Sequence, residues 1–169
     1  TAPATPRRPP APTTPRSTAA VHATPGPHRS ASAAGQPPTA WTSVVQQLDA
    51  VRADALVRRD TTSLSRVYTT GAAPMADDAN TIDTLVTKGF RVAGAAHRIV
   101  ATKLLTSAAA ADKGGETIQL AVTDSLPSYR VLDATGAVVG STAARASATR
   151  VLDLVQTSGG YRIAAVTTM

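Results

Sequence analysis

The chain contains no cysteine. It can therefore form no disulfide and no thiolate metal site, and it offers no cysteine nucleophile. Aromatic side chains are scarce as well, because one Trp, one Phe and three Tyr leave little surface on which bases could stack. No apolar run approaches the roughly 20 residues that span a bilayer, and no signal-peptide core is present. The chain starts at Thr1 rather than at a methionine, which we interpret as a mature or truncated product.

The first 40 residues lack acidic side chains and bulky apolar ones. All 11 Asp and Glu residues, and every Leu, Ile, Phe, Met and Trp, occur at Trp41 or later, whereas 10 of the 12 prolines precede it. Ordering a backbone costs about 1–2 kcal/mol per residue, which a segment with so little to bury cannot offset. We therefore predict a disordered Pro/Ala/Thr-rich linker over residues 1–40 and a folded domain over residues 41–169.

The net charge of +6 divides between these parts. Four arginines of the linker face no acid, while the folded part carries 13 basic and 11 acidic residues. No basic face interleaved with aromatic residues is visible, so we expect no nucleic-acid partner. The linker arginines could attract anionic lipids or wall polymers weakly, by about 1 kcal/mol each.

Hydrophobic periodicity predicts three helices in the first half of the domain. The first covers residues 40–59, with an apolar stripe formed by Trp41, Val44, Val45, Leu48, Val51, Ala55 and Leu56. A short second helix begins at Asp60 or Thr61, and its inner face holds Leu64, Val67 and Tyr68. After a break at Pro74, the third covers residues 75–88, with Ile82, Leu85 and Val86 facing inward. Gly71 and Gly89 suit the ends of the second and third helices.

The pattern then changes to the period of two that is typical of strands. One long strand is predicted over residues 90–107, with a bend at Gly94, and a hairpin turn over residues 112–115. The next strand places Ile118, Leu120 and Val122 on one face. Shorter strands follow at residues 129–132 and 138–139, and a last hairpin pairs residues 147–156 with 161–166. The fold class is therefore α+β, with three N-terminal helices packed on a curved antiparallel sheet.

Four segments carry a family resemblance: Leu48–Ala55, Leu64–Tyr68, Val122–Tyr129 and Gly159–Ile163. They resemble poorly characterised actinobacterial proteins, in which an extracytoplasmic domain often follows a transmembrane helix and a low-complexity linker. The order of elements is similar to the cone of the nuclear transport factor 2-like (NTF2-like, or SnoaL-like) superfamily, shared with polyketide cyclases and ketosteroid isomerase. The resemblance covers residues 41–169 and implies a fold and an extracytoplasmic location. It implies no particular activity, because the same fold hosts enzymes, binding modules and scaffolds.

Three residues are candidates for ligand contacts. His97, the only histidine outside the linker, lies on the predicted long strand, either as a base for proton transfer or as an exposed strand residue. Asp124 shares the phase of Val122 and could act inward as a general base, or it could accept backbone N–H bonds in a turn. Tyr129 could donate a hydrogen bond across that turn.

The other acidic and histidine residues suggest no site. Two aspartate pairs, Asp49 with Asp54 and Asp77 with Asp78, are expected to be solvated or helix-capping charges. The linker histidines, His22 and His28, lack a supporting ligand set, so we expect no metal and no cofactor.

Three functional hypotheses remain open. The first is a non-enzymatic extracytoplasmic domain, anchored or secreted, that binds a partner protein, an envelope component or a small apolar ligand. The second is an isomerase, dehydratase or cyclase that uses the cone pocket. The third is an architectural role in a larger membrane protein, with self-association, such as a homodimer, through an exposed sheet face.

Overall fold

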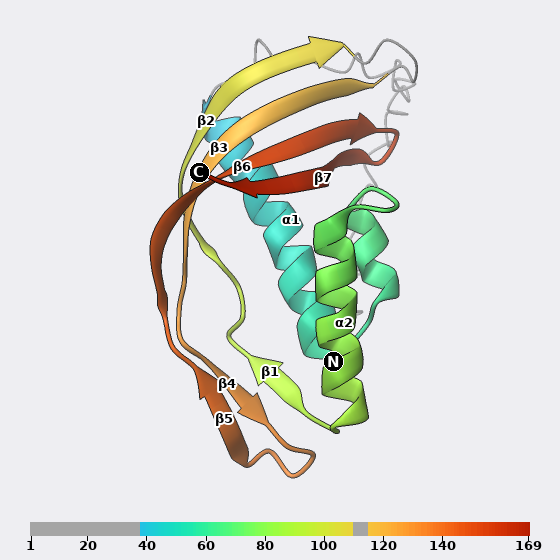
Figure 1. Ribbon diagram of the computed structural model, residues 1–169, viewed down its shortest axis with the longest axis vertical. Coiled ribbons are helices and arrows are strands. Elements are labelled where there is room, and N and C mark those ends of the chain that lie inside the picture. The colour runs from blue at the N-terminus through green and yellow to red at the C-terminus, as the bar shows by residue number, and fades with distance from the viewer. Residues whose placement is uncertain (1–37, 110–114) are drawn as a thin grey trace, which may run out of the picture. The chain divides into compact units, whose positions relative to one another are not determined.

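The structure is a computed structural model that describes residues 38–109 and 115–169 (Figure 1). The predicted linker lies outside the described residues except for its last three positions, which begin the first helix. Most of the predicted turn at residues 112–115 also lies outside them. The element order is α1 (Pro38–Arg58), η2 (Thr62–Arg66), α2 (Ala73–Thr87), β1 (Arg91–Ala93), β2 (Arg98–Ala109), β3 (Glu116–Leu126), β4 (Tyr129–Leu132), β5 (Val138–Thr142), β6 (Arg145–Thr157) and β7 (Gly160–Thr168).

The apolar stripe of α1 is confirmed. Trp41, Val45, Leu48 and Leu56 are buried, and they are the part of the helix that packs into the core. The helix ends where Arg59 adopts a left-handed backbone conformation with φ of 59°, which no longer continues the helical hydrogen bonds.

The predicted second helix is wrong in type. Residues 62–66 form a short 3₁₀ helix, so the described residues contain two α-helices rather than three. The backbone of the next residues pairs with β7 instead: Ile163 N donates to Val67 O at 2.8 Å, and Thr69 N donates to Ile163 O at 2.9 Å. Because those groups are used by the strand, an α-helix cannot extend through them. The predicted inner face is nevertheless right, since Leu64, Val67 and Tyr68 are all buried.

Helix α2 corrects two further expectations. Pro74 lies in its first turn, where the missing N–H costs nothing, so the proline starts the helix instead of separating it from the chain before it. Ile82 and Leu85 are buried as predicted, but Val86 is 53% exposed because it lies one position beyond the inner face. Gly89, with φ of 66°, ends the element as expected.

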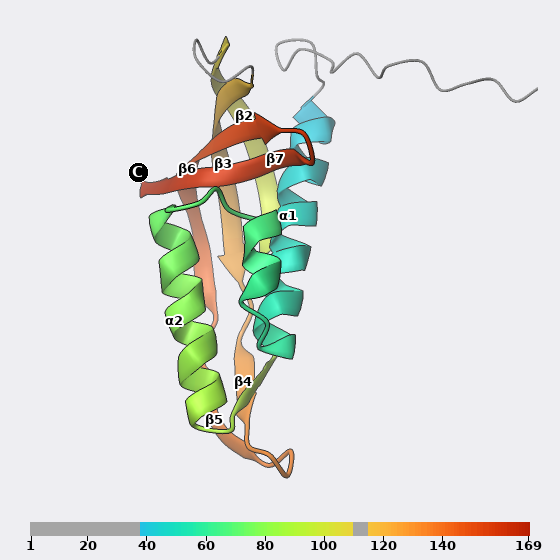
Figure 2. The same cartoon turned by 90° about the vertical axis from the view of Figure 1, so that its right-hand side faces the viewer.

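The strands form two antiparallel sheets, one of four strands in the order β2-β3-β6-β7 and one of three in the order β1-β4-β5. The predicted long strand is divided into β1 and β2 at Gly94, whose φ of 87° few other residues tolerate. Strand β3 alternates as predicted, with Ile118, Leu120, Val122 and Asp124 buried. Figures 1 and 2 show α1 and α2 over the concave side of the curved strands.

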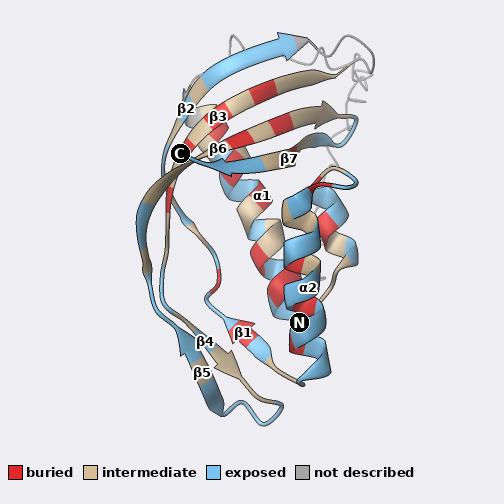
Figure 3. Ribbon diagram, viewed as in Figure 1, coloured by how far each residue is buried: buried red, intermediate tan, exposed pale blue. Residues whose placement is uncertain are grey.

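The core lies between the helices and the four-stranded sheet. Figure 3 shows buried positions both on the helices and on the strands of this sheet. Its largest fully buried side chains are Trp41, Leu64, Ile82, Ile118, Leu120, Leu154 and Val67. No helix in the described part of the chain has the length and apolar character needed to cross a membrane.

Candidate functional site

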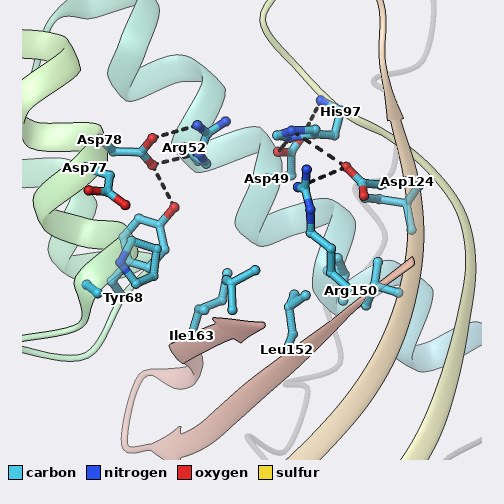
Figure 4. Close-up of a pocket in the computed structure, with 16 residues that line it drawn as sticks. Asp49, Arg52, Tyr68, Asp77, Asp78, His97, Asp124, Arg150, Leu152 and Ile163 are labelled. Carbon is cyan, nitrogen blue, oxygen red and sulfur yellow. Dashed lines mark hydrogen bonds and ion pairs between the residues drawn. The ribbon is translucent and has the colours of Figure 1, made fainter. Parts of the chain in front are cut away.

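A pocket of about 370 Å³ opens between the helices and the inner face of the sheet (Figure 4). Its floor is apolar and comes mainly from β2, β3, β6 and β7 of the four-stranded sheet. Charged side chains from α1, α2, β3 and β6 line its other walls. The apolar lining consists of Val45, Ile99, Val122, Leu152, Ile163 and Val166, together with Ala73 and Pro74. An apolar floor beside a few polar groups is the usual composition of a small-molecule site.

His97 and Asp49 form a doubly bonded pair at this pocket. The Nδ1 atom of His97 lies 2.6 Å from Asp49 Oδ1, and its backbone N–H donates to Asp49 Oδ2 at 2.8 Å. Both side chains are largely buried, at 16% and 12% exposure. A carboxylate accepts, so the geometry assigns the ring proton to Nδ1 and leaves Nε2 as the acceptor of the neutral ring. Asp49 thereby fixes both the rotation and the tautomer of the imidazole.

Asp124 lies on the other side of the same ring. Arg145 Nη2 donates to its Oδ2 at 2.6 Å. His97 Nε2 and Arg150 Nη1 each lie 3.7 Å from that oxygen, which is too long for a hydrogen bond. Arg145 therefore compensates the buried carboxylate. The imidazole nitrogen and the Arg150 guanidinium keep donor or acceptor capacity for another molecule.

A second charged cluster, formed by Arg52, Asp78 and Tyr68, closes the pocket beside α2. Arg52 donates two hydrogen bonds to Asp78, at 2.7 and 2.6 Å, and the Tyr68 hydroxyl donates to the same carboxylate at 2.7 Å. Burial alone would lower the pKa of Arg52, but the hydrogen bond and the charge of Asp78 outweigh it and raise the pKa above its usual value. Burial, with the bond to Asp78, raises the pKa of Tyr68 as well. At neutral pH the cluster therefore holds a guanidinium and a neutral phenol.

The structure brings two of the three candidate residues together and leaves the third elsewhere. His97 and Asp124 both line the pocket, whereas Tyr129 packs half-buried against the core and is not part of its lining. Within the described residues, no hydrogen bond joins Tyr129 to Asp124, and the bond to the Asp124 carboxylate comes from Arg145 rather than from a turn amide. His97 precedes β2 instead of lying on a strand, because the chain bends at Gly94. Binding of a ligand by these residues remains a prediction.

Two of the four aspartates expected to be solvated or capping are in fact buried partners. Asp49 holds His97, and Asp78 holds Arg52, whereas Asp54 and Asp77 are exposed as expected. The sequence contained a signal for both errors. Asp49 and Arg52 follow Val45 by four and seven positions, and Asp78 precedes Ile82 and Leu85 by the same steps, so each lies on a buried helix face.

Arg150 was also missed, although it lies in phase with the inward Leu152 and Leu154 of β6. No group of three or more His, Asp or Glu residues suited to a metal ion occurs in residues 38–109 and 115–169. At this pocket the Arg150 guanidinium can donate hydrogen bonds, and the His97 imidazole can also transfer a proton.

Comparison with known proteins finds no matching family model and no matching curated protein. Several solved structures are similar in fold. The intermembrane space region of the chloroplast protein ARC6 has a TM-score of 0.50 at 10% identity, over 79% of this chain and 98% of that one. A periplasmic fragment of TraM has a TM-score of 0.46 at 12% identity, over 77% and 95% of the two chains. An NTF2-like superfamily protein from Salmonella enterica serovar Typhimurium has a TM-score of 0.40 at 9% identity, over 78% and 91%.

Structures similar to this domain thus include a member of the NTF2-like superfamily, as the sequence resemblance predicted. At these identities the likeness concerns the fold alone. The architecture is α+β with a curved antiparallel sheet, as expected for that cone, but with two α-helices instead of three among the described residues. The actinobacterial origin stays a prediction.

Proposed function

We propose that this domain binds a small ligand with an apolar body and one hydrogen-bonding end in the pocket between its helices and sheet. The observation that carries the proposal is the distribution of polar groups. Apolar side chains form the floor, and the carboxylates of Asp49, Asp78 and Asp124 are each held by a histidine or an arginine. The pocket is therefore preorganised, which lowers the cost of binding.

The polar groups that keep unused hydrogen-bonding capacity indicate how such a ligand would lie. His97 Nε2 and the Arg150 guanidinium approach the same oxygen of Asp124 without hydrogen-bonding to it. A carbonyl or hydroxyl oxygen of the ligand can complete the hydrogen bonds of Arg150, and a ligand N–H or O–H can donate to Nε2. The apolar body would then cover Ile99, Leu152 and Ile163 on the floor.

The location proposed for the domain is extracytoplasmic, near the cell envelope, as an anchored or secreted protein. Composition supports it: residues 1–40 are rich in Pro, Ala and Thr and contain no acid, as in linkers that separate a module from a surface. Their four arginines add weak, salt-sensitive attraction to anionic polymers. The fold shared with the ARC6 intermembrane space region is compatible with such a location.

Filling the pocket tests the binding function directly. Ile99→Phe places a larger side chain on its floor, and Val100→Phe, at the neighbouring position that is 57% exposed, is the matched control. The probe is 8-anilinonaphthalene-1-sulfonate, whose fluorescence rises in apolar sites, and native mass spectrometry of each protein detects any co-purified ligand. We expect Ile99→Phe to lose probe and co-purified ligand while Val100→Phe keeps both. Equal binding by the two variants would place the binding outside this pocket.

A second candidate function, acid–base catalysis by an isomerase, dehydratase or cyclase, is favoured by one observation. Asp49 holds the Nδ1 side of His97, and Nε2 lies 3.7 Å from Asp124 in the lining of the pocket, where a general base could act. Arg150 could stabilise the oxyanion formed when a proton leaves the carbon beside a ligand carbonyl.

Hydrogen–deuterium exchange tests the catalytic candidate without knowledge of the substrate. The ketone 2-tetralone is incubated in D₂O with the wild-type chain or with His97→Gln, and loss of its α-protons is followed by NMR. Catalysis predicts faster exchange with wild type than with the variant. If both match buffer while the dye still binds, the domain binds without catalysing this step.

A further inference from the structure

A second hollow lies on a different face of α1, between that helix and the turn that joins β6 to β7. Its volume is about 500 Å³, and it shares no lining residue with the first pocket. Its lining comes from α1, from residues 159–162 and from Arg66 at the end of η2, and the α1 residues are Val44, Gln47, Leu48 and Val51. It is therefore a separate site whose properties do not depend on the proposed function.

The charge of this hollow is of one sign. Arg66 and Arg162 line it, and no acidic residue of the described chain does. Arg66 is exposed and Arg162 is half-buried, and in residues 38–109 and 115–169 neither takes part in an ion pair or a side-chain hydrogen bond. In the first pocket, by contrast, Arg52 is bonded to an aspartate. The second hollow thus presents two guanidinium groups whose donors are available to a ligand.

The rest of the lining is apolar and neutral. The Tyr161 ring packs edge-on against Trp41, with ring centroids 5.3 Å apart. Its hydroxyl is buried and has no hydrogen-bond partner within the described residues. Burial, together with the negative charge of Glu116, raises the pKa of Tyr161, so the phenol stays neutral at physiological pH. The phenol therefore adds no negative charge to the hollow.

We propose that this hollow binds an organic carboxylate, with the acid group at Arg66 and Arg162 and an apolar body on Val44, Leu48 and Val51. A guanidinium presents its donors in a planar fork that matches a carboxylate. A small inorganic anion would use the arginines and leave the apolar wall in water. The carboxylate belongs either to a free small acid or to the C-terminus of a polypeptide, since both present the same chemistry.

Amide NMR spectra of the full chain test the proposal with two matched probe pairs. Octanoate is compared with 1-octanol, and the peptide acetyl-Ala-Val-Leu with a free C-terminus is compared with its amide. Each is titrated into wild type, the double variant Arg66→Gln with Arg162→Gln, and Arg130→Gln. The last is the charge-matched control, because Arg130 is exposed on β4 and lines neither pocket.

We expect one of the two acids to shift the amide signals of residues 159–162 in wild type and in the control. In the double variant its affinity should fall about tenfold or more, as charge-assisted hydrogen bonds are lost. Which acid binds identifies the source of the carboxylate. The proposal is overturned if neither acid shifts these signals, if the uncharged analogue binds equally well, or if the double variant binds like wild type.

Discussion

Replacing Asp78 by alanine should destabilise this domain more than any change to its surface charges. The carboxylate is almost fully enclosed, with 8% of its side chain exposed, and it accepts hydrogen bonds from Arg52 and Tyr68. These three residues come from three segments, since α1 supplies Arg52, α2 supplies Asp78 and the chain after η2 supplies Tyr68. Loss of the carboxylate therefore removes the polar connection among them.

The magnitude follows from what the variant leaves behind. Arg52, with 22% of its side chain exposed, would keep its charge without a partner, and the Tyr68 hydroxyl would lose its acceptor. Breaking a buried ion pair on one side costs about 3–5 kcal/mol, a large part of the 5–15 kcal/mol that is typical of a whole domain. Asp54→Ala is the matched control. Its ion pair with Arg58 is 52% and 72% exposed, so its loss should cost about 0.3–0.5 kcal/mol.

Urea unfolding followed by the fluorescence of Trp41 measures both costs. It is the only tryptophan of the chain and is 1% exposed, so its emission reports the core. The midpoint should fall for Asp78→Ala at an unchanged slope. The double variant Arg52→Met with Asp78→Leu should recover much of the loss, because no unpaired charge stays buried. An Asp78→Ala protein as stable as Asp54→Ala would refute the reasoning, since the cluster would then contribute nothing beyond a surface pair.

Three further predictions concern other contacts of the domain. Ring ¹⁵N chemical shifts of neutral His97 should show the proton on Nδ1. Asp49→Asn should disturb that preference, because the Asn amide can donate as well as accept a hydrogen bond. A wild-type tautomer with its proton on Nε2 would contradict the assignment. The side-chain hydroxyls just after Asp60 in the chain donate hydrogen bonds to its carboxylate and lower its pKa to about 2. The stabilisation that the ionised carboxylate contributes is therefore complete above the ordinary pKa near 4 and is lost as the pH falls toward 2. Thermal unfolding of Asp60→Asn should show a smaller drop in Tm over that interval than wild type. Arg145→Met leaves the carboxylate of Asp124 without its hydrogen-bond donor. The free energy of unfolding, measured by urea titration, should fall by about 3 kcal/mol. A change below about 0.5 kcal/mol, the size of a surface effect, would show that other groups compensate the charge of Asp124.

The fold could be predicted where the signal is local. The stripe of α1 and the alternation of β3 both follow from residues within one element, because burial of one face imposes the period of that element. Periodicity also put Asp124 in phase with the buried Val122, which left an inward position and a turn as alternatives, and its 5% exposure supports the inward one. It failed at η2, where pairing of Val67 and Thr69 with β7 competes with an α-helix, a contact between segments about 95 positions apart.

The sequence alone determined the apolar stripe of α1, the alternation of β3 and the absence of thiol chemistry, since each depends on residue type and near neighbours. Tertiary structure decided the site. Asp49 meets His97 across 48 positions, and Arg52 meets Asp78 across 26. Such long-range contacts depend on the rotation of each helix against the sheet and on the register of the strands. Every packed side chain contributes to both. Periodicity can show that a charged residue faces inward, but only the packed fold selects the partner that makes its burial stable.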